Sequence, residues 1–411
     1  MGSFGARVLA RAGLVSIALC VAGGLIVGSA CTAAAGNDIV KVDPIAEVTQ
    51  RLARRLFPLS VARSGGRNAV VSPFSLCVTL HMAAGGAGGS TEKAFREALG
   101  IDAASTEAYV EAVGRSAGSV ASDDPQVTFR SVGGLWLASD AKPVPAYLAL
   151  LRNSFQARIE TADFSKPEAV KDINDWFADQ TQQMIPNMVS QLRADTRLLL
   201  ANALYFKGRW TTPFHASNQP APFHLTNGKT ADVPMMHHGD DSFQYAETSS
   251  YQAVKLPFGK GDFEVVVALP KQGVDPAANA VELISVASMP FSERSGWLAL
   301  PRLKLSAGGD VRPVLEAFGL KDAFSNSADF SRLTESRVRF DQVIHRVALS
   351  WDEQGAEAAA GTAVVLPKPG EVRADRFDMN VDRPFVFVLR HVRTGAAILV
   401  GLVNNPLESP S

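Results

Sequence analysis

"HRVALSWDEQGAEAAAGTAVVLPKPGEVRADRF", residues 345–377, changes character twice along its length. Between Gly355 and Gly361 almost every side chain is very small, a composition that favours a helix. The next five residues, Thr-Ala-Val-Val-Leu, have strand propensity, and Pro367 to Gly370 suit neither a helix nor a strand. The segment is therefore undecided between an exposed loop and a buried strand, and its structure depends on the rest of the chain.

The overall composition indicates a globular protein without a strong global charge. Of the 411 residues, 46% are hydrophobic, which is enough for a large core. The 40 Lys and Arg nearly balance the 41 Asp and Glu, so the formal net charge is -1. No global field therefore recruits nucleic acid, an anionic membrane or a strongly charged substrate.

The N-terminus has the layout of a secretory signal. Arg7 and Arg11 precede an apolar stretch from Leu14 to Val27, and small residues follow at 28–30. We expect residues 1–30 to be a signal peptide and the protein to be exported. The alternative, a membrane anchor, is less favoured because the apolar stretch is short for a span and contains glycines.

Cys31 adds a second alternative for the exported protein. A cysteine directly after small residues resembles the lipoprotein cleavage box, although Gly28 stands where that pattern has Leu, Val or Ile. Secretion and lipid anchoring through Cys31 therefore both stay open, with residues 31–42 as a short tether. Only Cys77 remains in the mature domain, so no internal disulfide can form, and its apolar helical surroundings predict a packed core thiol.

The periodicity of apolar residues predicts one large α+β domain from about residue 43, with mostly antiparallel sheets. Helices are expected at 43–57, 72–86, 171–185 and 310–320, the second with Ser72 as N-cap and Pro73 in its first turn. Strands are expected at 127–138, 198–206, 251–258, 263–270, 296–306, 337–351, 385–391 and 395–403.

Motifs of known enzyme chemistry occur without the context that they need. Ser116 lies in a G-x-S-x-G pattern, but a helical segment precedes it where a nucleophile elbow requires a strand. Ser90 and Thr91 lack the lysine of a phosphate-binding loop, and His237-His238 lack further ligands at metal-site spacing. We therefore expect these residues to be structural, and we expect no enzyme activity, metal or cofactor.

Six segments, in order along the chain, resemble the signature segments of the serpins, a family of serine protease inhibitors. They are NAVVSPFSL (68–76), INDWFADQTQQMI (173–185), LLLANALYFKGRW (198–210), LPRLKL (300–305), HRVALSWDEQGAEAAAGT (345–362) and DRPFVFVLRH (382–391). The resemblance covers residues 43–407. It implies the serpin fold, with three β-sheets, about nine helices and an exposed reactive loop.

The resemblance also implies a role for the small residues. In inhibitory serpins this hinge slides between two strands of the central sheet after a protease has cut the loop. The matching positions here are Glu353, Gly355, Ala356, Glu357, Ala358, Ala359, Ala360, Gly361 and Thr362. Small side chains lose little entropy on burial, and each inserted residue can gain about 1 kcal/mol from ladder hydrogen bonds.

Two polar groups match the family's sheet-opening positions. Ser72, Ser75, Asn202 and His345 match the cluster under the opening sheet, and Trp210, Arg302 and Glu353 match the place where the loop enters. We expect an ion pair between Glu353 and Arg302. We also expect His345 to bond to Asn202 and to a serine, since polar groups uncovered between strands need partners.

The position of the cut departs from the family pattern. Counting forward from Glu353 reaches Pro369, whereas counting back from Asp382 reaches Arg373, so the loop is four residues longer than usual. Arg373-Ala374 is our first choice for the cut bond, Arg376 the second and Lys368 the third. A basic residue there implies a trypsin-like serine protease as the partner.

Two prolines favour an alternative function. Pro367 and Pro369 would each remove a ladder donor and could halt insertion. A non-inhibitory serpin, cut as a substrate or acting as a binding protein, therefore stays open, as does an inhibitor of papain-like cysteine proteases. We expect a monomer prone to loop-sheet polymers, and we interpret the basic residues within 51–55 as a solvated face rather than a polyanion site.

Overall fold

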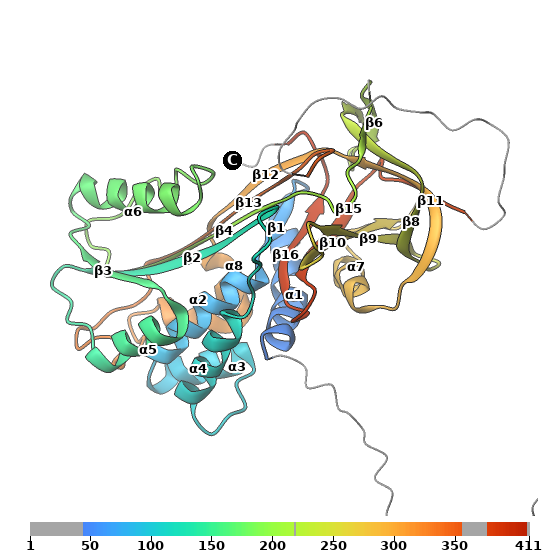
Figure 1. The fold of residues 1–411 in the computed structure, drawn as a ribbon. Coiled ribbons are helices and arrows are strands. Elements are labelled where there is room, and N and C mark those ends of the chain that lie inside the picture. The colour runs from blue at the N-terminus through green and yellow to red at the C-terminus, as the bar shows by residue number, and fades with distance from the viewer. Residues whose placement is uncertain (1–43, 218, 356–375, 409–411) are drawn as a thin grey trace, which may run out of the picture. The chain divides into compact units, whose positions relative to one another are not determined.

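The computed structural model describes residues 44–217, 219–355 and 376–408 (Figure 1). Predictions on the signal and tether, on Cys31, on hinge residues 356–362 and on Lys368, Arg373 and Ala374 lie outside these ranges. Within them, no helix is both long and apolar enough to cross a membrane.

Eight α-helices lie in the described ranges: α1 (Pro44–Arg63), α2 (Pro73–Gly86), α3 (Gly89–Leu99), α4 (Thr106–Ala117), α5 (Pro145–Phe155), α6 (Pro167–Gln180), α7 (Ala280–Ser285) and α8 (Arg312–Leu315). α2 starts as predicted, because the Ser72 hydroxyl accepts a hydrogen bond from the Ser75 amide at 3.0 Å and Pro73 opens the first turn. The helix expected at 310–320 is shorter than predicted, since Gly319 has a φ of 116° and α8 passes into a π turn.

A five-stranded sheet has the order β12-β13-β4-β2-β3. Its strands are β12 (Leu303–Asp310), β13 (Gln342–Trp351), β4 (Leu198–Gly208), β2 (Val127–Ala138) and β3 (Arg158–Ala162). The two central neighbours, β13 and β4, run parallel and are paired from Gln342 with Leu199 to Leu349 with Phe206. No strand separates them in the described chain, although a parallel pair is slightly less stable per residue than an antiparallel one.

Two further sheets complete the strand structure. The larger has the order β1-β16-β15-β10-β9-β8-β11-β14, with β5 paired to β8, and the smaller consists of β6 and β7. Their bounds are β1 (Ala69–Val71), β5 (His215–Ala216), β6 (Ala221–His224), β7 (Thr230–Val233), β8 (Met235–Glu247), β9 (Tyr251–Phe258), β10 (Phe263–Pro270), β11 (Ser292–Pro301), β14 (Phe377–Asn380), β15 (Phe385–His391) and β16 (Ala397–Val403). The mostly antiparallel α+β architecture is as predicted.

Two predicted strands differ from the structure. The run at 296–306 is divided at Arg302 between β11 and β12, which belong to different sheets, and the Arg302 amide bonds instead to the Pro234 carbonyl at 2.9 Å. The run at 337–351 becomes a strand only from Gln342. Residues 337–341 precede β13 and are not part of a strand.

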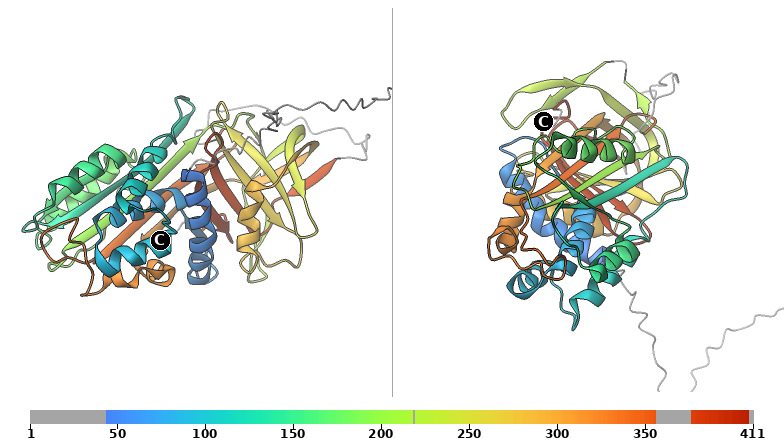
Figure 2. Two further views of the ribbon diagram at one scale, coloured as in Figure 1. Left: turned by 90° about the horizontal axis from the view of Figure 1, so that it is seen from below. Right: turned by 90° about the vertical axis from the view of Figure 1, so that its left-hand side faces the viewer.

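The inner strands β4 and β13 of the five-stranded sheet are buried on both faces. On one face, Leu204 of β4 and Val347 of β13 belong to the main core with α1 and α2. On the other face, α6 covers the sheet (Figure 2), and its Phe177 packs in a second core that includes Ala203 and Ala348. Burial of both faces explains why β4 reads as a continuous apolar run.

Candidate functional site

A tight turn follows β13 and directs the chain back toward the sheet. The Asp352 amide donates to the Gly355 carbonyl at 2.6 Å, and the Gly355 amide donates to the Asp352 carbonyl at 3.1 Å. These two residues form an antiparallel bridge around Glu353 and Gln354. Gly355 has a φ of 107°, and a Cβ there would lie 2.2 Å from the Gly208 carbonyl oxygen at the end of β4. Only glycine fits this position without a backbone shift.

Residues that follow β4 hold this turn in place. The Trp210 amide donates to the Gln354 carbonyl at 3.2 Å and the Phe214 amide to the Glu353 carbonyl at 2.7 Å. The Trp210 indole donates to the Asp352 carbonyl at 2.6 Å, and its ring stacks on Phe258 with a centroid distance of 4.3 Å. The turn is thus fixed over one end of the line along which β13 and β4 are paired. We call this line the gap, because an inserted strand would enter there.

Glu353 and Arg302 form the expected ion pair. The Arg302 Nε atom donates to Glu353 Oε1 at 2.6 Å, and its terminal nitrogen is 2.5 Å from the same oxygen. Glu353 is largely buried, with a side chain 12% exposed, whereas that of Arg302 is 43% exposed. Because Arg302 lies between β11 and β12, this pair connects the turn to both large sheets.

The predicted polar cluster lies halfway along the gap. His345 Nδ1 is 2.5 Å from Asn202 Oδ1, and the Ser72 amide donates to His345 Nε2 at 3.1 Å. Since Nε2 accepts, the ring proton is on Nδ1 and is donated to Asn202. The expected serine partner is therefore a backbone amide and not a hydroxyl. Burial lowers the pKa of His345 to about 3, so the ring is neutral at ordinary pH.

The hydroxyl groups of the two serines in the cluster do not bond to His345. The Ser72 hydroxyl donates to the Ile398 carbonyl of β16 at 2.7 Å. The Ser75 hydroxyl has no hydrogen-bond partner among the described residues. Asn202 and His345 are register partners on β4 and β13, so their hydrogen bond crosses the gap directly. Any strand that enters between β4 and β13 must break it.

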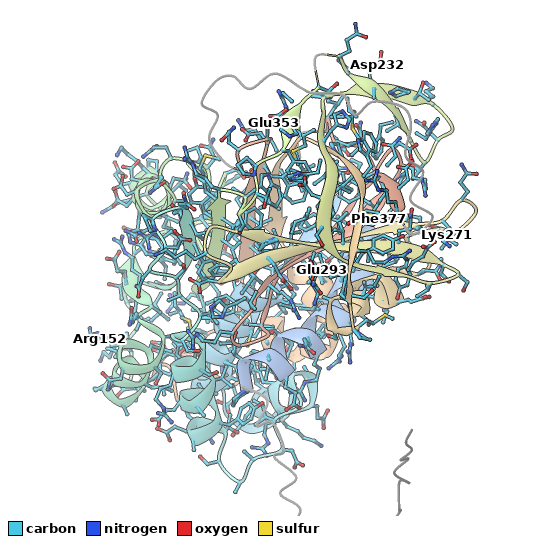
Figure 3. All side chains as sticks on the ribbon, turned by 45° about the vertical axis from the view of Figure 1, so that its right-hand side comes forward. Arg152, Asp232, Lys271, Glu293, Glu353 and Phe377 are labelled. Atoms are coloured by element: carbon cyan, nitrogen blue, oxygen red, sulfur yellow. The ribbon has the colours of Figure 1, made fainter. Side chains whose placement is uncertain are left out.

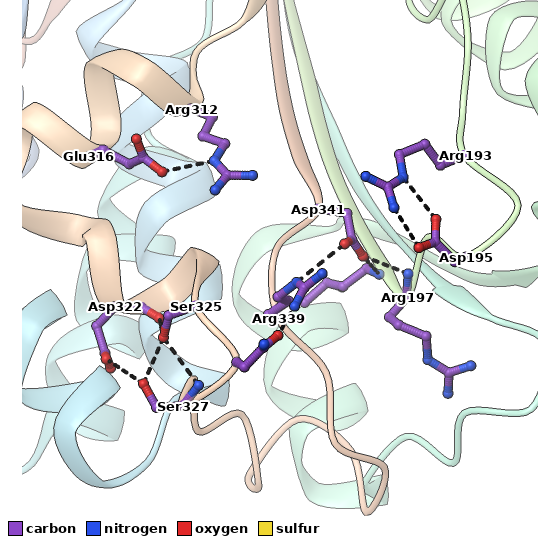
Figure 4. Close-up of polar contacts among 12 residues, drawn as sticks. Arg193, Asp195, Arg197, Arg312, Glu316, Asp322, Ser325, Ser327, Arg339 and Asp341 are labelled. Atoms are coloured by element: carbon purple, nitrogen blue, oxygen red, sulfur yellow. Dashed lines mark hydrogen bonds and ion pairs between the residues drawn. The ribbon is translucent and has the colours of Figure 1, made fainter.

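Asp341 closes the other end of the gap, and sequence reasoning missed it. Its carboxylate accepts hydrogen bonds from the Arg197 amide at 2.6 Å and the Leu198 amide at 3.3 Å, and its own amide donates to the Leu198 carbonyl at 3.1 Å (Figure 4). Arg339 lies 3.6 Å from the carboxylate. The only signal in the sequence is an aspartate just before a strand, which is too common to single out.

The next described range begins at Arg376, which is exposed and directly precedes β14. Phe377, the first residue of β14, is buried and stacks on Tyr245 with a centroid distance of 4.1 Å. Figure 3 labels Glu353 and Phe377, which lie apart in the structure. Residues 356–375 therefore connect the five-stranded sheet to the edge of the larger one.

The remaining candidate residues make structural contacts. Ser116 lies inside α4, so the strand-to-helix turn of a hydrolase elbow is missing. Thr91 donates to Asp322 at 2.7 Å, and His238 contacts Asp241 at 2.7 Å. No group of three or more potential metal ligands occurs in the described ranges. Cys77 is fully buried, and burial raises the pKa of its thiol, so it is a core residue.

The basic residues of α1 bind backbone carbonyls. Arg51 donates to the Gly100 carbonyl at 3.3 Å. Arg55 donates to the carbonyls of Ala98 and, at 3.1 Å, Phe318. Cations suit these positions because Ala98 and Gly100 lie at the C-terminal end of α3. Two of the three arginines in this segment are therefore committed to the fold.

Comparisons with known proteins agree with this geometry. The family model described as Serpin (serine protease inhibitor) matches residues 47–406. The chain is 29% identical over 388 residues to "Serine protease inhibitor" of Cyanea capillata, covering 88% of this chain and 98% of the relative. It is also 29% identical over 376 residues to "Plasminogen activator inhibitor 1" of Sus scrofa, covering 86% and 90%.

Solved structures share the same fold. The thermophilic serpin tengpin in its native state aligns with a TM-score of 0.79 at 23% identity, covering 88% of this chain and 94% of its own. Thyroxine-binding globulin in complex with thyroxine aligns with a TM-score of 0.78 at 23% identity, covering 88% and 99%. The matched family model spans nearly all of the described residues. The chain belongs to the serpin family and has the serpin fold.

Proposed function

We propose that this serpin is an exported suicide-substrate inhibitor of trypsin-like serine proteases. The observation that carries the proposal is the Asp352–Gly355 bridge, which starts an antiparallel hairpin beside β13. A strand that continues from it is antiparallel to β13. Because β4 is parallel to β13, the same strand is also antiparallel to β4. The turn is thus oriented for insertion between them once the loop is cut.

The bridge suggests a register for such an insertion. If an inserted strand continued the bridge, Ala356 would lie opposite Trp351 and Val365 opposite Gln342, since opposite residues step in reverse order. Alternate residues of β13, among them Val343, Val347 and Leu349, face the main core. In that register the residues opposite these core-facing positions would be Ala356, Ala358, Ala360, Thr362 and Val364. All are small or β-branched, as a buried strand requires.

The energy available is large relative to the bonds that cross the gap. Insertion replaces one parallel contact by two antiparallel ones along the ten residues of β13. At about 1 kcal/mol per additional ladder bond, the gain is on the order of 10 kcal/mol. That gain can move a covalently attached protease to the far end of the sheet and distort its active site.

The same register would keep both prolines outside the ladder. Pro367 would lie opposite Phe340 and Pro369 opposite Val338, and both of these residues precede β13. Neither proline would then interrupt the ladder. On this proposal the four extra residues would lie between the inserted strand and Arg373 and would not block insertion.

The site of the cut also has support from the described residues. A protease needs an extended, accessible bond, but a cut after Arg376 would fall at Phe377, which is buried and paired in β14. Lys368 is followed by Pro369, which most trypsin-like enzymes do not cleave. Arg373-Ala374 avoids both obstacles and remains the proposed bond.

A binding-protein role is the second candidate. The likeness to thyroxine-binding globulin at 23% identity shows the fold alone. A papain-like cysteine protease could also be acylated at the same bond. Each alternative predicts a different product from the same assay, since a binding protein is cut without a trapped protease.

Incubation of the mature protein with trypsin near equimolar ratio tests the proposal. We expect a complex that survives boiling in detergent and a released fragment that begins at Ala374. Cleavage without a complex would overturn the inhibitor proposal for trypsin. Papain in place of trypsin tests the cysteine-protease alternative. The mass of the exported N-terminus separates free secretion from lipid attachment at Cys31.

A further inference from the structure

Three arginines line one cavity at the end of the gap where β4 and β13 begin. Arg197 directly precedes β4, and Arg337 and Arg339 lie in the segment before β13. The open cavity has a volume of about 350 Å³ and is lined by Arg197, Ser325, Asn326, Arg337, Val338 and Arg339. No carboxylate is among these described residues. The cavity therefore presents cations and neutral polar groups without a counter-ion on its wall.

The three guanidinium groups have donors to spare. Arg337 is exposed and has no hydrogen-bond or ion-pair partner in the part of the chain that the structure describes. Arg197 pairs through one terminal nitrogen with Asp140 at 2.8 Å, and Arg339 donates through one terminal nitrogen to Asn326. Each guanidinium group carries five N–H groups, so several donors stay available to a ligand.

The neutral residues of the cavity are held in place by bonds of their own. Asn326 Oδ1 accepts from Arg339, which leaves the amide NH2 group of Asn326 as a further donor. The Ser325 hydroxyl donates to the Asp322 carbonyl at 2.8 Å and lies 2.7 Å from the Ser327 hydroxyl (Figure 4). These contacts fix the turn that carries Ser325 and Asn326 beside the arginines.

Carboxylates near the cavity already have partners of their own. Asp341 accepts from two backbone amides at the start of β4, and Asp322 accepts from two hydroxyl groups of α3. Asp140, which pairs with Arg197, has a side chain that is 70% exposed, so water and salt screen its charge. The arginines are therefore not neutralised as a group, and Arg337 has no carboxylate partner among the described residues.

We propose that this cavity binds a tetrahedral oxyanion, a phosphate or sulfate group, and that the bound anion holds the start of β4 to the start of β13. A guanidinium group suits such an anion because two of its N–H groups can bond to two oxygens at once. Arg197 is on the β4 side, whereas Arg337 and Arg339 are on the β13 side. An anion that contacts both sides therefore links the two strands across the gap.

This arrangement gives the anion a preference for the closed sheet. An inserted strand separates β4 from β13 by a further strand spacing of about 4.8 Å, so the anion loses its contacts on one side. A ligand that binds the closed form more tightly shifts the equilibrium toward that form. The anion should thus slow insertion. This second part rests on the proposed insertion mechanism, whereas binding to the intact protein does not.

Inorganic phosphate tests the site on the intact mature protein. Titration calorimetry measures its dissociation constant, and melting temperatures are compared between phosphate and sodium chloride of equal ionic strength. Arg337→Ala removes the cation without a partner. Arg193→Ala is the control of equal charge change, because Arg193 is exposed, pairs with Asp195 and does not line the cavity. We expect Arg337→Ala to weaken phosphate binding roughly tenfold, as for loss of a charge-assisted hydrogen bond, and Arg193→Ala to change it by less than about twofold.

The alternative results have distinct meanings. Absence of phosphate binding, an equal rise in melting temperature in sodium chloride, or equal weakening by both variants would overturn the site. Melting temperatures in sodium chloride identify a variant that is simply misfolded, and Arg337→Lys, which keeps the charge, should then recover part of the affinity. Glycerol phosphate separates the two sources of the anion. Tighter binding of this ester supports a site for a phosphate group on a larger molecule, and weaker binding supports a site for the free anion.

Comparison of intact and cut protein tests the link to insertion. We expect phosphate to bind the intact form more tightly than the cut form and to slow the loss of trypsin-trapping capacity at elevated temperature. Equal affinity for a cut form that has gained thermal stability would overturn the link. A wild type that traps no protease and gains no stability on cutting overturns the proposed function, and phosphate titration of the intact protein still accepts or rejects the site.

Discussion

Replacement of Asp341 by alanine tests whether its hydrogen bonds to the start of β4 keep the intact sheet closed. Its carboxylate, 16% exposed, accepts from the Arg197 amide at 2.6 Å and the Leu198 amide at 3.3 Å. A hydrogen bond to a charged group contributes about 1.5–3 kcal/mol, and the longer second bond adds little. We therefore expect Asp341→Ala to destabilise the intact protein by about 2–3 kcal/mol.

The effect should depend on whether the loop is inserted. An inserted strand separates β13 from β4 by another strand spacing of about 4.8 Å, so the bonds from Asp341 to 197 and 198 cannot persist. The substitution then costs little in the cut form. Since 1.4 kcal/mol corresponds to a factor of ten, spontaneous insertion in the intact protein should accelerate by up to about 30-fold for 2 kcal/mol.

Denaturant unfolding of intact and cut protein measures this difference, and incubation at elevated temperature measures the rate of spontaneous insertion as loss of trypsin-trapping capacity. Asp195→Ala is the matched control, because Asp195 is exposed and pairs with the also exposed Arg193 two residues away. Equal destabilisation of the intact and cut forms by Asp341→Ala would refute the reasoning.

Three further predictions follow from single residues. The pKa of His345 is lowered from 6.5 to about 3, so the stability contribution of His345 is full above pH 6.5 and falls as the pH drops toward 3, by about 1.4 kcal/mol per pH unit. Urea unfolding of His345→Gln at several pH values should lack this slope, and parallel pH–stability curves for the wild type and the variant would contradict the prediction. Gly355→Ala should lower the melting temperature more than Gly228→Ala, because Gly228 also has a positive φ of 78° but has open space where a Cβ would lie. Equal shifts in melting temperature would show that the contact with Gly208 does not matter. Arg373→Glu should abolish the trypsin complex on gels while Lys368→Glu retains it, and the reverse result would move the cut bond.

Local sequence signals predicted the elements whose buried apolar residues follow a regular pattern. The strand at 127–138 and the strands at 251–258, 263–270 and 385–391 have the predicted bounds, because alternating or continuous apolar residues end at turn residues. The start of α2 was predicted equally well from Ser72 and Pro73, since capping is a local interaction.

The signals failed where tertiary pairing decides the structure. β8 was missed because His237, His238, Gly239 and two aspartates interrupt its apolar pattern, yet it pairs with β9, β11 and β5. The break between β11 and β12 depends on an amide bond from Arg302 to a residue 68 positions earlier, Pro234. No local pattern encodes such a partner.

In the candidate site, too, the sequence identified some residues and contacts and missed those that depend on tertiary packing. The resemblance located Glu353, Arg302, His345 and Asn202, and the structure places them in the two expected contacts. It did not reveal that the Ser72 amide is the second partner of His345. That contact depends on how α2 packs against the sheet, which the segment matches do not specify.

The bonds that cross the gap determine how the intact form persists. The parallel pairing of β13 and β4, the His345–Asn202 bond and the Asp341 contacts must all open before an inserted strand can form its own ladder. On the proposed mechanism the closed sheet is therefore protected by a kinetic barrier, although the inserted form is lower in free energy by about 10 kcal/mol. A substitution that weakens a gap-crossing bond then leaves the chain able to insert. It lowers activity by premature insertion or by admitting a neighbour's loop, so the loss grows with storage time and concentration and is absent in freshly refolded protein.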